Sequence, residues 1–191
     1  MVRAAAERSV DAKIIYLWGG DSSGKSHLLS AACASSPSAI ALFAPLPVEL
    51  PTATLLAIDD VDNLDETDQI RLFNLINLIQ APDCDVTLLA AGHTSPGNLV
   101  MRRDLSTRLG SGLVYQLHPL SDDEKTHALH VHAKARGFAL HTDVATYLLR
   151  HVRRDMRSLI AMLDTLDRYS LETGRNITVP LLKQATQNLT S

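Results

Sequence analysis

The sequence predicts an α/β protein, in which a parallel β-sheet flanked by helices is followed by a smaller all-helical domain. Short apolar runs of strand length alternate with longer helix-like segments up to about residue 118. After that point the strand pattern disappears and helix-start signals take over. The charge changes there too: residues 1–120 carry 8 basic and 13 acidic residues, and residues 121–191 carry 10 basic and 8 acidic residues. We therefore expect two domains, residues 1–119 and 120–191.

Five apolar runs in the first domain have the length of strands, and Gly, Pro, Asp or Ser bounds them. They cover residues 13–18, 39–43, 54–58, 86–91 and 113–117. Helices are expected at residues 26–35 and 66–80. The second of these helices has one apolar stripe, made of Leu72, Leu75, Ile76 and Ile79. Residues 44–51 are rich in proline, so we expect an extended connector there.

Four helices are expected in the second domain. The first begins after Ser121, which opens an S-x-x-E capping box, and it ends near Gly137, which can adopt the left-handed conformation. The second helix begins after Thr142, and the third covers about residues 155–171. The fourth helix begins after Thr178, with a proline in its first turn.

Composition excludes several classes of protein. With 46% hydrophobic and 20% charged residues, the chain is neither wholly disordered nor a membrane protein. The first eight residues contain an acid and lack an apolar stretch, so they are not a signal peptide. A net charge of −3 argues against a protein held to nucleic acid by bulk charge. The two cysteines, Cys33 and Cys84, argue against a disulfide framework and favour a cytoplasmic location.

Residues 19–26 read Gly-Gly-Asp-Ser-Ser-Gly-Lys-Ser and match the phosphate-loop pattern G-x-x-x-x-G-K-[ST]. They follow a predicted strand and open a predicted helix, as this motif requires. Gly19 and Gly24 allow the backbone to turn its N–H groups toward one anion, and the helix N-terminus adds partial positive charge. We expect Lys25 to reach the β/γ-phosphates and the Ser26 hydroxyl to bind Mg²⁺. The alternative is a Gly/Ser-rich turn without a ligand.

The second half of such a site is an acid at the end of another strand. Residues 55–58 are apolar and are followed by Asp59 and Asp60. We expect Asp59 to hold Mg²⁺ through water and Asp60 to orient a water for attack on the γ-phosphate. The alternative is a strand that ends in a solvated acidic loop. For Asp60 this alternative stays open, because an Asp is one methylene shorter than a Glu.

Several stretches together carry a family resemblance, at residues 16–18, 24–34, 58–61, 104–109, 117–125, 136–138 and 154–159. Through them the chain resembles AAA+ ATPases of the DnaA family, and within it the Hda-type regulators of DnaA. The resemblance runs from about residue 14 to 187. It implies a five-stranded parallel sheet with helices on both faces, followed by a helical lid.

The resemblance also implies roles for two arginines. Arg108, in the stretch called box VII, would be an arginine finger that enters the nucleotide site of a neighbouring subunit. Arg154 would be the sensor 2 arginine, which touches the phosphates bound to its own chain. A surface ion pair is the alternative for either arginine. The expected nucleotide-binding residues are Gly19, Gly20, Asp21, Ser22, Ser23, Gly24, Lys25, Ser26, His27 and Arg154. The expected catalytic residues are Asp59, Asp60 and Arg108, and the expected Mg²⁺ ligands are Ser26 and Asp59.

The chain also departs from the DnaA pattern. Residues 44–54 are too short and too proline-rich for the helical insertion that grips single-stranded DNA, and no helix-turn-helix domain follows the lid. His93 stands where the family usually has an Asp, so it can hold a γ-phosphate or a water only in a suitable tautomer. An ordinary loop histidine is the alternative. The residues before the first strand show no sliding-clamp motif of the Hda type, so clamp binding would need a segment outside this chain.

These observations favour a regulator of DNA replication initiation over an initiator. We expect it to bind ADP or ATP with Mg²⁺, to dock on DnaA and to stimulate hydrolysis of DnaA-bound ATP. The chain itself would be at most a weak ATPase, with little direct DNA binding and no membrane contact. Three alternatives stay open: a self-sufficient ATPase or helicase-loader-like protein, a small DnaA-like DNA-binding factor, and an interaction module that binds no nucleotide. The sequence leaves open the preference for ADP or ATP and whether the chain forms a homo-oligomer.

Overall fold

The computed structural model describes residues 12–174 and 177–182. It divides the chain into two compact units, one ending at Pro119 and the other beginning at Leu120. Each unit has its own hydrophobic core. Two predictions concern residues outside the described part of the chain. One is the absence of a clamp motif in the first eleven residues, and the other is the part of the expected fourth helix beyond residue 182.

The first unit contains a five-stranded parallel sheet in the order β2-β3-β4-β1-β5, which confirms the predicted sheet. Its strands are β1 (Ile14–Trp18), β2 (Ala39–Leu42), β3 (Leu55–Ile58), β4 (Thr87–Gly92) and β5 (Leu113–Gln116). Trp18 lies opposite Gly92, and Ile58 lies opposite Ala90. The loops after β1, β3 and β4 therefore meet at one edge, the carboxyl edge, where open α/β sheets bind ligands.

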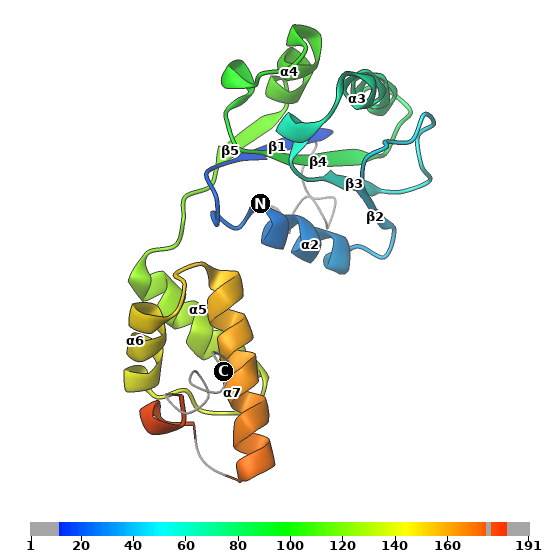
Figure 1. Cartoon of the computed structure of the whole chain (residues 1–191). Coiled ribbons are helices and arrows are strands. Elements are labelled where there is room, and N and C mark those ends of the chain that lie inside the picture. The colour runs from blue at the N-terminus through cyan, green and yellow to red at the C-terminus, as the bar shows by residue number, and fades with distance from the viewer. Residues whose placement is uncertain (1–11, 175–176, 183–191) are drawn as a thin grey trace. The chain divides into compact units, whose positions relative to one another are not determined.

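Helices cover both faces of this sheet (Figure 1). The helical elements of the unit are α2 (Lys25–Ser35), η1 (Val61–Asn63), α3 (Glu66–Ile79), η2 (Pro96–Asn98) and α4 (Arg103–Gly110). Because side chains alternate along a strand, Ile15 and Leu17 pack with α2, whereas Ile14 and Tyr16 pack with α3 and α4. Three layers result, and they confirm the predicted α/β class.

Helix α4 is absent from the elements that the sequence predicts. It has eight residues, and only Leu105 and Leu109 of them are buried. Two apolar residues one turn apart are too few to make a periodic pattern stand out. The helix is held in place by burial of these two leucines in the core next to α3 rather than by a strong local signal.

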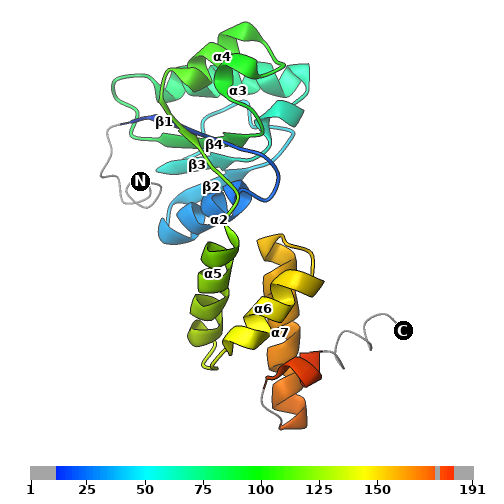
Figure 2. The ribbon, with the colours of Figure 1, turned by 90° about the vertical axis from the view of Figure 1, so that its left-hand side faces the viewer.

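The second unit consists of helices α5 (Asp122–Ala135), α6 (Thr142–His151) and α7 (Met156–Thr173), and residues 179–182 are also helical (Figure 2). The predicted capping box at the start of α5 is confirmed, because Ser121 and Glu124 satisfy each other's backbone N–H groups. The backbone hydrogen bond from Ser121, followed by its hydroxyl, lowers the pKa of the Glu124 carboxyl. Gly137 has a φ of 88° after α5, as the sequence predicts.

Side-chain contacts join α5 and the residue that follows it to α7 inside the second unit. His132 Nε2 lies 2.7 Å from Asp164 Oδ1, and Arg136 Nε donates to Asp167 Oδ2 at 3.0 Å. In the described part of the chain, no helix is long and apolar enough to cross a lipid bilayer.

Candidate functional site

The loop between β1 and α2 has the backbone conformation that the phosphate-loop motif predicts. Gly24 precedes α2 with a φ of 93°, and Ser22 has a φ of 59°. A Cβ atom on Gly19 would overlap the Leu117 carbonyl oxygen and lie 2.8 Å from Ser23 Oγ, so only glycine fits there. Alternating left-handed residues of this kind curve the backbone into an anion-binding concavity.

The start of α2 offers backbone donors to a ligand. The N–H groups of Lys25, Ser26 and His27 have no acceptor within the described residues. Ser26 and His27 are exposed, as are Gly20, Asp21, Ser22 and Gly24 in the loop. Free N–H groups and the partial positive charge of a helix N-terminus together favour an anion such as a phosphate.

Lys25 is buried without a carboxylate partner among the residues that the structure describes. Its side chain is 6% exposed, and its Nζ donates to the carbonyl oxygens of Gly19 at 2.7 Å and Gly20 at 3.1 Å. A buried ammonium group is costly unless an opposite charge compensates it. A bound phosphate would supply that charge.

Two buried side-chain oxygens have no hydrogen-bond partner within the described part of the chain, Ser23 Oγ and Asp62 Oδ1. Ser23 belongs to the phosphate loop, and Asp62 lies in η1, just after β3. Buried polar atoms in folded proteins are normally satisfied, so unpartnered ones indicate a place where a ligand or water completes the structure. Both atoms belong to loops at the carboxyl edge of the sheet.

The acidic pair follows β3 as predicted. Asp59 is half-buried, and its Oδ1 accepts the backbone N–H of Asp60 at 3.0 Å. Asp60 is exposed and has a φ of 50° where η1 begins. The Asp59 carboxylate and the Ser26 hydroxyl are oxygen donors of the kind that Mg²⁺ binds. The residues of this edge therefore fit a magnesium nucleotide, and the individual roles of Asp59 and Asp60 stay predictions.

His93 joins the phosphate loop to the acidic loop, a contact that the sequence did not reveal. Its Nε2 lies 3.3 Å from Asp21 Oδ1. Its Nδ1 lies 3.3 Å from Asp62 Oδ2 and 3.9 Å from Asp60 Oδ1. Its backbone N–H also donates to Asp62 Oδ2 at 2.6 Å. His93 therefore links two loops at this edge, and its position where the family usually has an Asp was the one signal for it in the sequence.

Tyr16 and Gly92 fix the segment that carries His93. The Tyr16 hydroxyl donates to the Thr94 carbonyl oxygen at 2.9 Å. Burial, with a smaller contribution from the charge of Asp62, raises the pKa of Tyr16 well above its ordinary value. A Cβ on Gly92 would overlap the Tyr16 hydroxyl, so glycine is required at this close approach.

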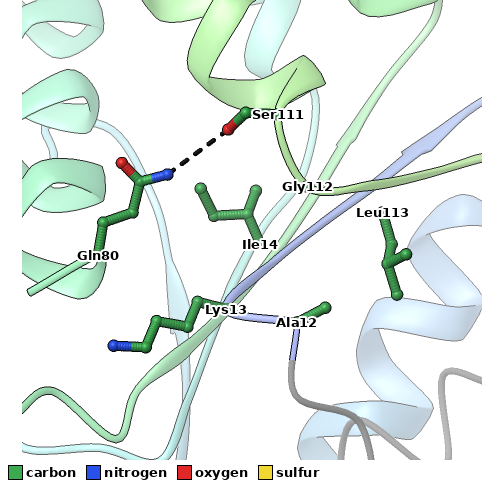
Figure 3. A pocket seen from close by; sticks show the side chains of 7 residues that line it. All are labelled: Ala12, Lys13, Ile14, Gln80, Ser111, Gly112 and Leu113. Carbon is green, nitrogen blue, oxygen red and sulfur yellow. Dashed lines mark hydrogen bonds between the residues drawn. The ribbon is translucent and has the colours of Figure 1, made fainter. Parts of the chain in front are cut away.

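Arg108 lies at the other edge of the sheet, the amino edge. It is exposed in the last turn of α4, donates to Gln80 Oε1 at 2.8 Å, and has its guanidinium carbon 6.0 Å from the centre of the Phe73 ring. Gln80 in turn contacts Ser111, and both line a shallow hollow of about 560 Å³ at the amino ends of β1 and β5 (Figure 3). The hollow is lined by Ala12, Lys13, Ile14, Gln80, Ser111, Gly112 and Leu113.

The two edges are separated by the length of the strands. β1 has five residues and so spans about 16 Å. The phosphate loop follows its carboxyl end, whereas the hollow beside Arg108 lies at its amino end. The structure therefore does not bring Arg108 to the phosphate loop of its own chain.

Arg154 precedes α7 in the second unit. Its side chain is 66% exposed, and its Nη1 lies 3.9 Å from Asp122 Oδ2. The neighbouring Asp155 caps the helix by accepting the Ser158 backbone N–H at 2.8 Å, and this hydrogen bond is the main cause of the lowered pKa of Asp155. The expected contact of Arg154 with a nucleotide stays a prediction.

Comparison with known proteins finds one matching family and several similar folds. Residues 122–186 match the family described as the lid domain of Hda. The fold resembles domain III of the replication initiation protein DnaA from Thermotoga maritima, with a TM-score of 0.78, 18% identity, and coverage of 98% of this chain and 90% of that one. The chain therefore has an AAA+ fold like that of DnaA, and its second unit resembles the lid domain of Hda.

Other solved structures agree with this fold. AMPPCP-bound DnaA from Aquifex aeolicus matches with a TM-score of 0.73 and 20% identity over 87% of this chain and 59% of that one. The RuvB branch-migration motor of Thermotoga maritima matches with a TM-score of 0.71 and 17% identity over 98% of this chain and 65% of that one. The chain thus spans about three fifths of the length of the Aquifex protein.

Proposed function

We propose that this AAA+ protein binds an adenine nucleotide with Mg²⁺ in its phosphate loop and stimulates hydrolysis of ATP bound to DnaA. The position of Arg108 is the observation that carries the proposal. An exposed arginine at the amino edge cannot serve the nucleotide at the carboxyl edge of the same chain, but it can enter the site of a neighbouring subunit. The lid match to Hda and the fold match to DnaA domain III support DnaA as that neighbour.

The bound nucleotide would be held mainly by this chain's backbone and by Lys25. The free N–H groups at the start of α2 would donate to phosphate oxygens, and Lys25 would exchange its two carbonyl partners for a phosphate. Ser26 and Asp59 would hold Mg²⁺, which supplies charge compensation on the phosphates. Asp60 would orient a water.

Arg108 would act on the partner's nucleotide. A guanidinium group presents a planar fork of donors to phosphate oxygens and keeps its charge at all relevant pH values. Such a group, supplied in trans, accelerates phosphoryl transfer by roughly 10³–10⁵. To reach the partner, Arg108 would break its hydrogen bond to Gln80. This is a single exposed hydrogen bond, so breaking it costs little free energy.

The proposal is tested by release of phosphate from DnaA loaded with labelled ATP. Arg108→Ala should abolish the stimulation while leaving the affinity of this chain for nucleotide unchanged. Arg103→Ala is the matched control, because Arg103 is an exposed arginine in the first turn of the same helix. Equal stimulation by wild-type protein and Arg108→Ala would refute the proposal.

A second candidate function is that of a self-sufficient ATPase. The complete phosphate loop and the Asp59–Asp60 pair favour it, because they supply both halves of a hydrolytic site apart from the arginine. It predicts steady ATP turnover by this chain alone, which Asp60→Asn would abolish. We expect turnover by the isolated chain to stay far below that of the mixture with DnaA.

A further inference from the structure

We propose that His93 is a positioning residue that holds the Asp21 carboxylate of the phosphate loop against the acidic loop and so away from the incoming phosphates. The inference rests on the proposed nucleotide binding. It adds a specific task for a histidine that contacts carboxylates from two different loops.

The contacts of His93 reach across three strand ends. The histidine follows β4, which lies between β1 and β3 in the sheet. Its Nε2 faces Asp21, after β1, and its Nδ1 faces Asp62, after β3. Ionised carboxylates only accept hydrogen bonds, so each contact needs an N–H on the ring. The imidazolium form can donate to both carboxylates, and the neutral form can donate to one.

Asp21 is the one acidic side chain within residues 19–26, and it is 93% exposed. Its backbone belongs to the expected nucleotide-binding loop, whereas the negative charge of its side chain opposes the binding of a polyphosphate at the adjacent N–H groups. A contact at 3.3 Å with His93 fixes that carboxylate on the side of the acidic loop. Without the imidazole, the Asp21 side chain is free to turn over the loop that it belongs to.

The anchor for this contact is built on the opposite side of the ring. Asp62 accepts the His93 backbone N–H at 2.6 Å, and its side chain is only 19% exposed. Asp60 adds a third carboxylate at 3.9 Å from Nδ1. The segment itself is fixed by the Tyr16 hydroxyl on Thr94. The rigid side of the contact is therefore the acidic loop, and the phosphate loop is the part that it restrains.

Two readouts on His93→Ala, Asp21→Ala and the double variant test the inference. By isothermal titration with Mg-ADP, His93→Ala should bind about tenfold more weakly than the wild type, because a like charge is set free beside the phosphates. Asp21→Ala in the same chain should restore the affinity to within about twofold of the wild type. His93→Gln, which keeps one side-chain donor, should lose only about threefold. Asp83→Ala and His127→Ala are controls, since both residues are exposed and remote in sequence from these loops.

A loss of affinity that Asp21→Ala does not restore would overturn the inference, as would an unchanged affinity of His93→Ala. The second readout is amide hydrogen exchange of residues 19–24 in the nucleotide-free protein. Exchange should be faster in His93→Ala and in Asp21→Ala than in the wild type. The double variant should exchange no faster than either single variant. Wild-type protein that binds no nucleotide would refute the proposed function. In that case unchanged exchange in His93→Ala would overturn the restraint itself, and faster exchange would support it.

Discussion

The carboxyl and amino edges of the parallel sheet present different chemical groups. The carboxyl edge has the phosphate loop, the buried Lys25 and a group of carboxylates, whereas the amino edge has the exposed Arg108 beside Gln80 and Phe73. In the proposed function, one chain therefore supplies the cradle and another supplies the arginine. Head-to-tail contacts of this type join unlike surfaces of neighbouring subunits.

Removing the charge at the carboxyl edge should have the largest effect. Lys25→Ala should weaken the affinity for ADP or ATP by about 100-fold or more, because it removes charge-assisted hydrogen bonds to phosphate. The matched control is Lys13→Ala. In the wild-type chain the Lys13 ammonium group donates to the Ala81 carbonyl oxygen at the amino edge. Calorimetric titration of both variants measures the difference, and equal affinities would remove the basis for calling the carboxyl edge a nucleotide site.

A smaller effect is expected from the acid at the same edge. Asp59→Asn should lower the affinity for nucleotide about tenfold in Mg²⁺ and leave it unchanged in EDTA, because the carboxylate acts through the metal ion. Asp83→Asn, an exposed acid in the loop before β4, is the control. A loss of the same size in EDTA would show that Asp59 acts on the fold or on the nucleotide directly.

Ser22 allows a test of the backbone rather than of the charges. Its φ of 59° is a left-handed conformation that glycine adopts without steric cost. Ser22→Gly should therefore raise the free energy of unfolding by about 0.5 kcal/mol. Ser30→Gly, on the exposed side of α2, should lower it by a similar amount. Thermal unfolding that shows both variants destabilised would mean that Ser22 has a role beyond its backbone conformation.

The smallest effect concerns the helix that carries Arg108. The hydrogen bond from Arg102 to Asp104 holds the pKa of the Asp104 carboxyl below its ordinary value of 3.8. A lowered pKa in the folded state gives stability that is present above the ordinary value and is lost as the pH falls through the folded value. Between about pH 5 and pH 3, the wild-type protein should therefore lose slightly more stability than the Asp104→Asn variant does. Identical acid profiles would show that the pair contributes nothing to α4.

The sequence was most informative where one short segment contains the whole signal. The phosphate loop, the apolar stripe of α3 and the capping box at Ser121 are each local patterns. The five strands could be read from short apolar runs, because parallel strands are buried on both faces. The family resemblance then implied that the sheet has five strands and that a helical lid follows it.

The sequence was least informative where the signal lies in contacts between distant segments. His93 meets Asp21 and Asp62, which are 72 and 31 positions earlier in the chain. Arg108 contacts Gln80, 28 positions earlier, and only the sheet topology places both at the amino edge. The sequence did not predict helix α4, because only two buried leucines mark it. None of these features has a period or a spacing that reveals it.

In the proposed function, Arg108 serves a nucleotide that is bound to another subunit. The most direct measurement is a structure of this chain in complex with DnaA that carries a non-hydrolysable ATP analogue. We predict that the Arg108 guanidinium has left Gln80 and lies within about 3 Å of a γ-phosphate oxygen on the partner. A complex in which Arg108 still contacts Gln80, with another group on that γ-phosphate, would contradict the claim.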